Sequence, residues 1–497
     1  MPYLIFILIF LLQALPQKVM AQENKKIGGL ILDAKRQTPL PYTNIIVLHK
    51  NLGTISNEKG YFSLDIDNVN STDSLSFQYI GYKTLNICIT DIDSNTTIHL
   101  QEEIINLNET FIFSNPPNAK TIVKKILDNK SKNYKKVTQK NQIFIRRRNS
   151  ADINRIKIIY KKNDIPELNE KIIHNIEQNM PKHNISYTDF LGEIYTSASI
   201  KDSIKLKPIK IVSLKSKDVS ELEQTFKIFD KLFTDTKAKE YWKVKSGIFS
   251  QKLDISTDED DSKKDSVKEK NSYRTETNYL NRSVKNQYSY GDLEDTDDWD
   301  FLYHTGNYKY ILAGGTRING EDAYIIDFTP KNSGKFIGRI YVSIESYALI
   351  RADYKYDINK TGTDISLFGV GYTSNYFEGS IFFEKKDNNY VLKYLSKKTG
   401  NIVHLDRNIS LIKKRERFLF DKELRELKVK FHYTVSSINS SEILVLNQNK
   451  ITELQFKQIK QAKMSKIILV NQFNSEIWKG YPIIEPTQSM KEYKKID

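Results

Sequence analysis

Short runs of alternating apolar and polar residues dominate the first hundred residues of the chain. In residues 61–66, Phe62, Leu64 and Ile66 alternate with Tyr, Ser and Asp, which is the period of a strand with one buried face. Similar runs recur about every 8–12 residues between turn signals, which predicts an antiparallel sandwich of about seven strands over residues 25–102. The strands are expected at residues 27–33, 42–48, 54–57, 61–66, 74–79, 84–89 and 97–100.

The turns of this segment contain residues with defined conformational roles. Pro39 and Pro41 fix φ and offer no N–H group to a ladder, so we expect a turn between the first two strands. Gly60 ends another turn signal and is expected to take positive φ. Asn57 precedes it and supplies a side-chain acceptor for nearby backbone N–H groups.

Helical and extended patterns are mixed in residues 103–250. An apolar stripe at i, i+1, i+4 and i+5 from Ile122 predicts an amphipathic helix over residues 119–130 with Asn118 as its N-cap. Further helices are predicted at residues 171–180 and 220–233, and extended segments at residues 104–113, 142–145, 157–161, 187–199 and 207–214.

The strand pattern returns after a polar segment. Residues 254–270 are almost all polar, which predicts a disordered polar loop over residues 251–275. Consecutive strand patterns over residues 276–445 predict an antiparallel meander or half-barrel, with hairpins at Asn319-Gly320 and at residues 385–389. Its strands are expected at residues 308–313, 316–318, 323–329, 339–344, 348–356, 380–384, 391–397 and 429–435.

Residues 446–497 are predicted to form a helix over residues 452–464 and an extended tail. Gly369 and Gly371 lie among strand patterns and are interpreted as a strand bend or bulge. The predicted class is mainly β, or α+β overall: an N-terminal seven-stranded antiparallel sandwich, a mixed α/β linker region, and the meander or half-barrel. A chain of 497 residues is expected to contain two to four domains.

The N-terminus has the pattern of an export signal. An apolar run over residues 3–12 is followed by Pro16 and the small-residue end Val19-Met20-Ala21, which predicts a signal peptide over residues 1–21. Past it no apolar run approaches the roughly 20 residues that cross a bilayer, so no transmembrane span is expected after cleavage. Cys88 is the single cysteine, which excludes an intramolecular disulfide.

The net charge of +15 is interpreted as diffuse, because Lys is frequent throughout. Attraction to anionic envelope polymers or lipid headgroups is the alternative. Arg146-Arg147-Arg148 is the tightest arginine group, and it is expected to close the strand at residues 142–145. Nucleic acid is not an expected partner, because binding would need a focused basic patch or a known module.

No catalytic, cofactor-binding or metal-binding residue is predicted. HExxH, GxSxG, P-loop and GxGxxG motifs are absent from the sequence. The acidic string at residues 292–300 is interpreted as a solvated or helix-capping loop, with Ca²⁺ binding as the alternative. The histidines are scattered, at His49, His99, His174, His183, His304, His404 and His432.

Four ordered strings, at residues 29–33, 38–45, 53–62 and 77–83, resemble the carboxypeptidase-regulatory-like domain. Asn57 departs from the Asp that this family usually has before the glycine turn. The resemblance implies a prealbumin-type β-sandwich without catalytic residues, which serves for folding, docking or spacing. It also implies a cell-envelope protein of a Gram-negative bacterium, in the periplasm or associated with the outer membrane.

Residues 320–330 and 338–351 loosely resemble lipoprotein-carrier-type half-barrels, which implies a concave face for a ligand. We therefore predict a non-enzymatic, exported binding or scaffold protein whose partner is an envelope protein or a hydrophobic ligand. One alternative is an envelope hydrolase acting on peptides or glycans, which requires a convergent polar cluster such as His304 with residues 292–300. A surface adhesin is the other alternative.

Overall fold

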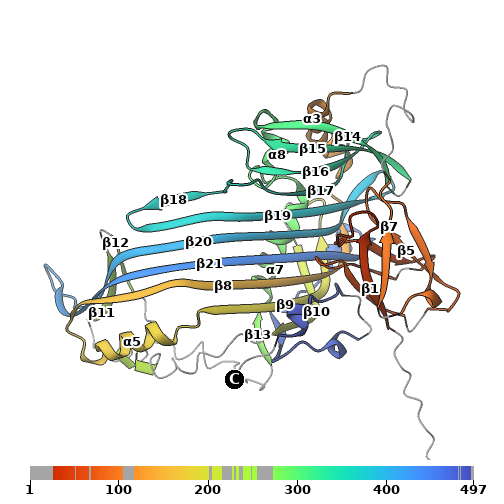
Figure 1. Cartoon of the computed structure of the whole chain (residues 1–497). Helices are drawn as coiled ribbons and strands as arrows, with labels where there is room; N and C mark the ends of the chain where they lie inside the picture. Colours follow the sequence, from red (N-terminus) through yellow and green to blue (C-terminus); the bar gives the residue numbers. More distant parts are fainter. Residues whose placement is uncertain are drawn as a thin grey trace, which may run out of the picture. The chain divides into compact units, whose positions relative to one another are not determined.

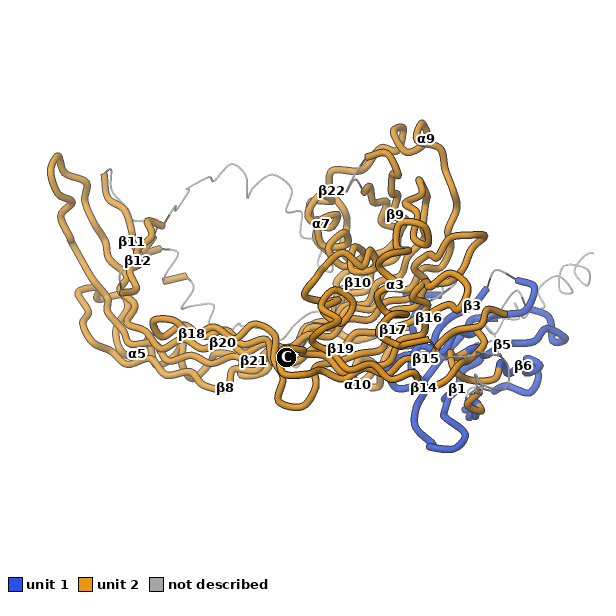
Figure 2. Tube along the Cα trace, turned by 90° about the horizontal axis from the view of Figure 1, so that it is seen from above, with its two compact units in different colours: residues 1–78, 84–100, 476–485 blue, residues 79–83, 101–475, 486–497 orange. Residues whose placement is uncertain are grey.

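The computed structural model divides the chain into two compact units, both built mainly of strands (Figure 2). Unit 1 comprises residues 1–78, 84–100 and 476–485, and unit 2 comprises residues 79–83, 101–475 and 486–497. The structure describes residues 26–50, 52–66, 69–93, 95–103, 117–200, 204–214, 227–228, 231–233, 239–247, 249–253, 272–318, 320–479, 481 and 483–493. The predicted signal peptide, the extended segment at residues 104–113, and most of the polar loop and of the helix at residues 220–233 lie outside these residues.

Unit 1 is the predicted sandwich of seven strands. Its three-stranded sheet has the order β4 (Tyr61–Asp65), β1 (Lys26–Asp33), β7 (Thr96–Leu100). The other sheet has the order β3 (Gly53–Ile55), β2 (Asn44–Val47), β5 (Ser74–Gln78), β6 (Leu85–Cys88). Phe62 and Phe77 meet between the sheets edge to face, with ring centroids 5.4 Å apart, and both are buried. The alternating apolar residues of the sequence therefore form one core.

The turn predicted around Asn57 and Gly60 is confirmed. The Asn57 side-chain oxygen accepts hydrogen bonds from the N–H groups of Lys59 (2.9 Å) and Tyr61 (3.1 Å), and Gly60 has φ +79°. The sandwich differs from the prediction in one pairing, because β1 and β7 run parallel. Alternation along a strand determines which face is buried, but not the direction of its neighbour.

Unit 2 is organised around one large, open sheet (Figure 1). The meander is confirmed in the run from β14 to β21, where neighbouring strands are antiparallel. Strands from both sides of residue 250 share this sheet, so the predicted mixed linker region is part of it. The order is β13 (Ser272–Glu276), β22 (Met464–Val470), β10 (Ile204–Leu214), β9 (His183–Thr196), β8 (Gln139–Asn163), β21 (Lys422–Lys450), β20 (Asn389–Arg415), β19 (Val370–Lys386), β17 (Leu349–Tyr356), β16 (Phe336–Ser343), β15 (Glu321–Pro330), β14 (Tyr308–Ile318).

Three short strands extend this sheet at its edges. β11 (Glu240–Ser246) pairs with the outer part of β20, and β12 (Phe249–Lys252) pairs with β11. β18 (Asp364–Leu367) pairs with β19. Phe368 and Gly369 both have positive φ (51° and 76°) and form the two-residue turn of this hairpin. The prediction of a bend or bulge at Gly369 is therefore wrong, because Leu367 pairs directly with Val370 across the turn.

Strands β8, β20 and β21 have 25, 27 and 29 residues. At about 3.3 Å per residue, β20 is about 90 Å long. The strands predicted at residues 142–145 and 157–161 are two parts of β8, and the arginines at 146–148 lie within it rather than at its end. Sequence patterns divided these strands because polar residues occupy both faces of parts of the sheet.

The predicted helices agree with the structure where residues are described, with one exception. α3 (Ala119–Asp128) has Asn118 as its N-cap, whose side chain accepts hydrogen bonds from Lys120 and Thr121 N–H, and α5 (Glu170–Asn179) matches the second prediction. The helix predicted at residues 452–464 is wrong in length, because α9 ends at Gln458 and β22 begins at Met464. Pairing of β22 with β10 and β13 outweighs the weak helical pattern there.

Glu453, in the first turn of α9 (Glu453–Gln458), contacts the residues just before β8 and just after β9. Its carboxylate accepts hydrogen bonds from the Thr138 hydroxyl, from Ser197 Oγ (2.8 Å) and from Ser199 N (3.2 Å). Desolvation alone would raise the pKa of Glu453. The hydrogen bonds outweigh it, with that from Thr138 contributing most and those from Ser197 and Ser199 less, and lower the pKa to about 2.

We expect this contact to make unfolding pH-dependent. Because the folded pKa lies below the ordinary value of 4.5, the stabilisation is present above pH 4.5 and is lost as the pH falls toward 2. Urea unfolding between these pH values should show a smaller loss of stability in Glu453→Gln than in the wild type. Equal pH dependence of the two proteins would contradict the role of the carboxylate.

Candidate functional site

The middle of the long sheet in unit 2 has one apolar and one polar face. Two rows of directly paired residues cross five strands, and residues opposite one another share a face. One row is Ile365, Tyr372, Val403, Val435 and Ile153, from β18, β19, β20, β21 and β8 in turn. The next row on that face is Leu367, Val370, Leu405, Tyr433 and Ile156.

We call the surface formed by these two rows the apolar face. Four of its side chains are largely exposed: Ile365 (57%), Leu367 (60%), Val370 (40%) and Tyr372 (42%). Those from β20, β21 and β8 are partly exposed. Five strands span about 19 Å across this face. Along β20 the charged Arg407 follows Leu405 on the same face, opposite Phe431, so the apolar rows end there. Contiguous exposed apolar side chains bounded by polar residues are typical of binding surfaces.

The same side of the sheet is covered at the outer end of the strands. There α5 (Glu170–Asn179) lies on β8, and its buried Ile173 joins a cluster that contains Trp242 and Leu427. Ile158, Tyr160, Leu411 and Val429 pack partly buried against this cluster.

The inner end of this side is covered by α7 (Thr277–Tyr288) and the short helix η3 (Ser289–Asp292). Arg147 of β8 donates a hydrogen bond to Ser283 of α7 (2.7 Å), and Lys397 of β20 lies 4.8 Å from the ring centre of Tyr290. The apolar face therefore lies between two covered regions of the sheet. Its side chains are apolar and partly or largely exposed.

The opposite side of the middle section is polar. The row that alternates with the apolar rows contains Gly371, His404, Thr434 and Arg155, and His404 Nδ1 lies 3.0 Å from Thr434 Oγ1. Asp406 pairs with Lys430 (3.2 Å) and with His432 (3.1 Å). Desolvation alone would raise the pKa of Asp406, but the hydrogen bond from Lys430 and the contacts with His432 outweigh it, so that this pKa lies below its ordinary value. The section thus has the pattern of an antiparallel sheet with one solvated polar face and one apolar face.

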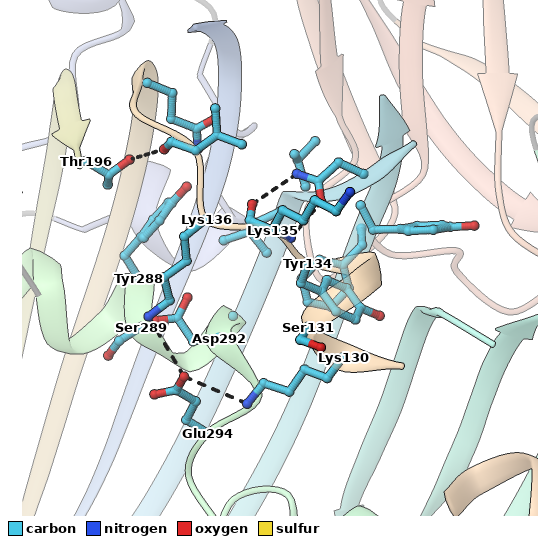
Figure 3. A pocket seen from close by; sticks show the side chains of 18 of the residues that line it. Lys130, Ser131, Tyr134, Lys135, Lys136, Thr196, Tyr288, Ser289, Asp292 and Glu294 are labelled. Atoms are coloured by element: carbon cyan, nitrogen blue, oxygen red, sulfur yellow. Dashed lines mark hydrogen bonds and ion pairs between the residues drawn. The ribbon is translucent and has the colours of Figure 1, made fainter. Parts of the chain in front are cut away.

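Unit 2 also contains a cavity of about 570 Å³ beside α4 (Lys130–Asn133) and η3. Figure 3 shows Lys130 and Lys136 directed at Glu294, with both ammonium groups 3.9 Å from its carboxylate. Desolvation lowers the pKa of Lys130. Tyr134 lines the same cavity and donates to the Leu349 carbonyl (2.7 Å). The polar groups of this cavity largely satisfy one another, which makes it a weaker candidate for a hydrophobic ligand than the apolar face.

The predicted acidic string does not converge on one point. Asp295 accepts hydrogen bonds from Asp297 and Asp298 N–H, Glu294 pairs with the cavity lysines, and Asp298 pairs with Lys397. Among the residues that the structure describes, no group of three or more His, Cys, Asp or Glu side chains is placed to hold a metal ion.

His304 does meet the acidic string, as the hydrolase alternative requires. Its Nδ1 lies 2.7 Å from Asp300, which is buried and also accepts a hydrogen bond from Tyr308 (2.5 Å). The pKa of Tyr308 is raised mainly by burial, and this hydrogen bond raises it further. The three side chains are not among those lining the cavity, and Tyr308 also accepts hydrogen bonds from the N–H groups of Lys335 and Phe336. These contacts have a structural role in holding α8 (Asp300–Tyr303) against β14.

The other histidines occupy separate places. His49 is in a turn with positive φ, His174 is on α5, and His183 contacts Asp152 (2.6 Å). His99 contacts Gln37 in unit 1 (3.2 Å), and His404 and His432 lie on the polar side of the sheet. No site residue was predicted from the sequence, and the apolar face was missed. The signal was present in Leu427, Val429, Phe431, Tyr433 and Val435, which alternate without a break.

Comparison with known proteins defines the class of unit 1. Residues 27–112 match the family model of the CarboxypepD_reg-like domain. The chain therefore begins its described part with a carboxypeptidase-regulatory-like domain, as its four sequence strings indicated. The match does not include the apolar face, which lies beyond residue 112.

Two solved structures have remote similarity to the chain. A chain in the Pseudomonas aeruginosa MucA/MucB complex has 6% identity and a TM-score of 0.18, over 65% of this chain and 93% of that one. A putative membrane-associated protein of unknown function from Bacteroides fragilis has 9% identity and a TM-score of 0.13, over 86% of this chain and 98% of that one. No curated protein matches the chain. Similarities at these TM-scores carry no functional argument. Among the described residues, no helix is long and apolar enough to cross a membrane.

Proposed function

We propose that this protein is a non-catalytic binding protein of the cell envelope that holds a hydrophobic ligand on the apolar face. The observation that carries the proposal is the pair of apolar rows across β18, β19, β20, β21 and β8 between two covered regions. Such a surface lowers the free energy of a bound alkyl or acyl chain by removing apolar area from water on both partners.

The proposed setting is the periplasm or the outer membrane of a Gram-negative bacterium, after export. The carboxypeptidase-regulatory-like domain supports this setting and would act as a docking or spacing module. The strip of Thr399, Asn401, Ser437 and Asn439, on the same side of the sheet toward α7, offers polar groups near the end of the apolar face. A ligand with an acyl chain and a polar head fits this arrangement, with the chain on the apolar face and the head at the polar strip.

Binding of a dansyl-labelled fatty acid to the purified protein tests the proposal. We expect saturable binding with a shift of dansyl emission to shorter wavelength, because the probe enters an apolar environment. Mass spectrometry of organic extracts of the protein should find a co-purified lipid. Absence of saturable binding together with lipid-free extracts would contradict the proposal. So would hydrolysis of peptides or glycans that is lost when a single polar residue is replaced.

A further inference from the structure

The turn between β20 and β21 presents three consecutive apolar side chains to solvent. Phe418, Leu419 and Phe420 are 102%, 78% and 86% exposed. On one side of the hairpin, the pairing of β21 with β8 ends at Leu427, opposite Asn163. On the other side, the pairing of β20 with β11 ends at Arg415, opposite Glu240. The turn therefore extends beyond both neighbouring strands, at the end of the long hairpin in Figure 1.

This composition is unusual for a hairpin turn. Turn positions favour Gly, Asn, Asp and Ser, whose side chains suit the local backbone and water. Two phenylalanines and a leucine contribute little to folding there, because they bury little area in the folded chain. Their exposure points to a binding partner that covers them.

Charge around the turn is strongly positive. The outer part of the long sheet, in residues 155–179, 239–253 and 407–430, has eighteen Lys and Arg residues and nine Asp and Glu residues. Its net charge of +9 is more than half of the net charge of the chain, +15. Arg417 directly precedes the apolar residues, and Lys422 follows them after Asp421. The prediction of a diffuse charge is therefore too simple for this end of unit 2.

Some of these cations are neutralised within the protein. Lys413 and Arg415 both pair with Glu240 (3.1 and 2.6 Å), and Arg425 pairs with Glu167 (3.3 Å). Asp421 accepts a hydrogen bond from Tyr241 (2.6 Å). These pairs do not reduce the net charge of +9, because that value already subtracts the charge of every Asp and Glu in these residues.

We propose that this turn inserts into the surface of a bilayer that contains anionic lipids. A protruding wedge of three apolar residues fits the boundary between headgroups and acyl chains, where Phe and Leu side chains bury shallowly. Arg417 and Lys422 lie one and two residues from the wedge, or roughly 3–7 Å at strand spacing, which places them among the headgroups. Each nearby Lys or Arg adds attraction to an anionic surface. An anionic bilayer presents an extended negative surface to all of these cations at once, which a pocket on a partner protein does not.

Flotation with vesicles of phosphatidylcholine and phosphatidylglycerol tests the proposal. We expect the wild type to float with these vesicles, and less with pure phosphatidylcholine or at high salt. The triple variant F418S/L419S/F420S should have a partition coefficient lower by roughly 100-fold. Leu454→Ser is the matched control, since Leu454 of α9 is 66% exposed and lies outside the turn. Equal thermal unfolding of the three proteins shows that the fold is retained.

A second variant reports on insertion directly. Tryptophan emission of L419W should shift to shorter wavelength when vesicles with phosphatidylglycerol are added. The triple variant should bind the dansyl-labelled fatty acid like the wild type, which separates this inference from the proposed function. Absence of wild-type flotation, or equal flotation of the triple variant, would overturn the inference. Flotation without an emission shift in L419W would overturn it as well, and would indicate attachment through charge alone.

Discussion

The double variant L405D/Y433D should bind the dansyl-labelled fatty acid at least about 100-fold more weakly than the wild type. Leu405 and Tyr433 are directly paired at the centre of the apolar face. Two carboxylates there replace apolar contact area and must lose water when an acyl chain covers them. A 100-fold loss corresponds to about 2.7 kcal/mol of binding free energy. Fluorescence titration measures the effect.

Thr434→Asp is the matched control for this variant. Thr434 lies next to Tyr433 in β21, and its side chain is on the polar side, where it meets His404. The same type of substitution should leave the affinity within about twofold, because the charge remains in water. Equal losses in the two proteins would show that the ligand does not use the apolar face. Denaturation of each variant in urea excludes unfolding as the cause.

Asp189→Ala should lower the free energy of unfolding by about 3–5 kcal/mol. Asp189 of β9 and Arg146 of β8 are directly opposite in the sheet, and their side chains are 1% and 5% exposed. The guanidinium donates two hydrogen bonds to the carboxylate, at 2.9 Å from Nε and 2.7 Å from the terminal nitrogen. Without the carboxylate the buried charge of Arg146 has lost its counter-ion. Equilibrium unfolding in urea measures the change.

Two controls separate charge burial from the loss of any salt bridge. Asp387→Ala removes the partner of Lys450 (3.1 Å), but both side chains are more than 70% exposed, so the loss should be at most about 1 kcal/mol. The double variant R146M/D189L replaces both charges with apolar side chains and should recover most of the stability. A loss below about 1 kcal/mol in Asp189→Ala would show that the arginine finds water or another partner.

Much of the fold could be predicted from local patterns. The sandwich of unit 1, the turn at Asn57, the N-cap at Asn118 and the helix α5 each depend on residues within a few positions of one another. Such interactions require only the periodicity of one element or the chemistry of one turn. The family resemblance of unit 1 has the same origin, because each of its four strings is a short local segment of a strand and its adjoining turn.

The candidate site could not be predicted in the same way. Its ten side chains come from five strands, and Ile153 of β8 reaches the same row as Val435 of β21 only through the register of their pairing. A shift by one residue would place the polar neighbours on that face instead. Polar residues on both faces of β8 between its two apolar parts also divided it into two apparent strands. The sequence determined the alternation in each strand and the apolar turn at residues 418–420. Only the tertiary structure decided which strands are neighbours and which part of their common face the described residues leave exposed, since these depend on contacts between residues far apart in the chain.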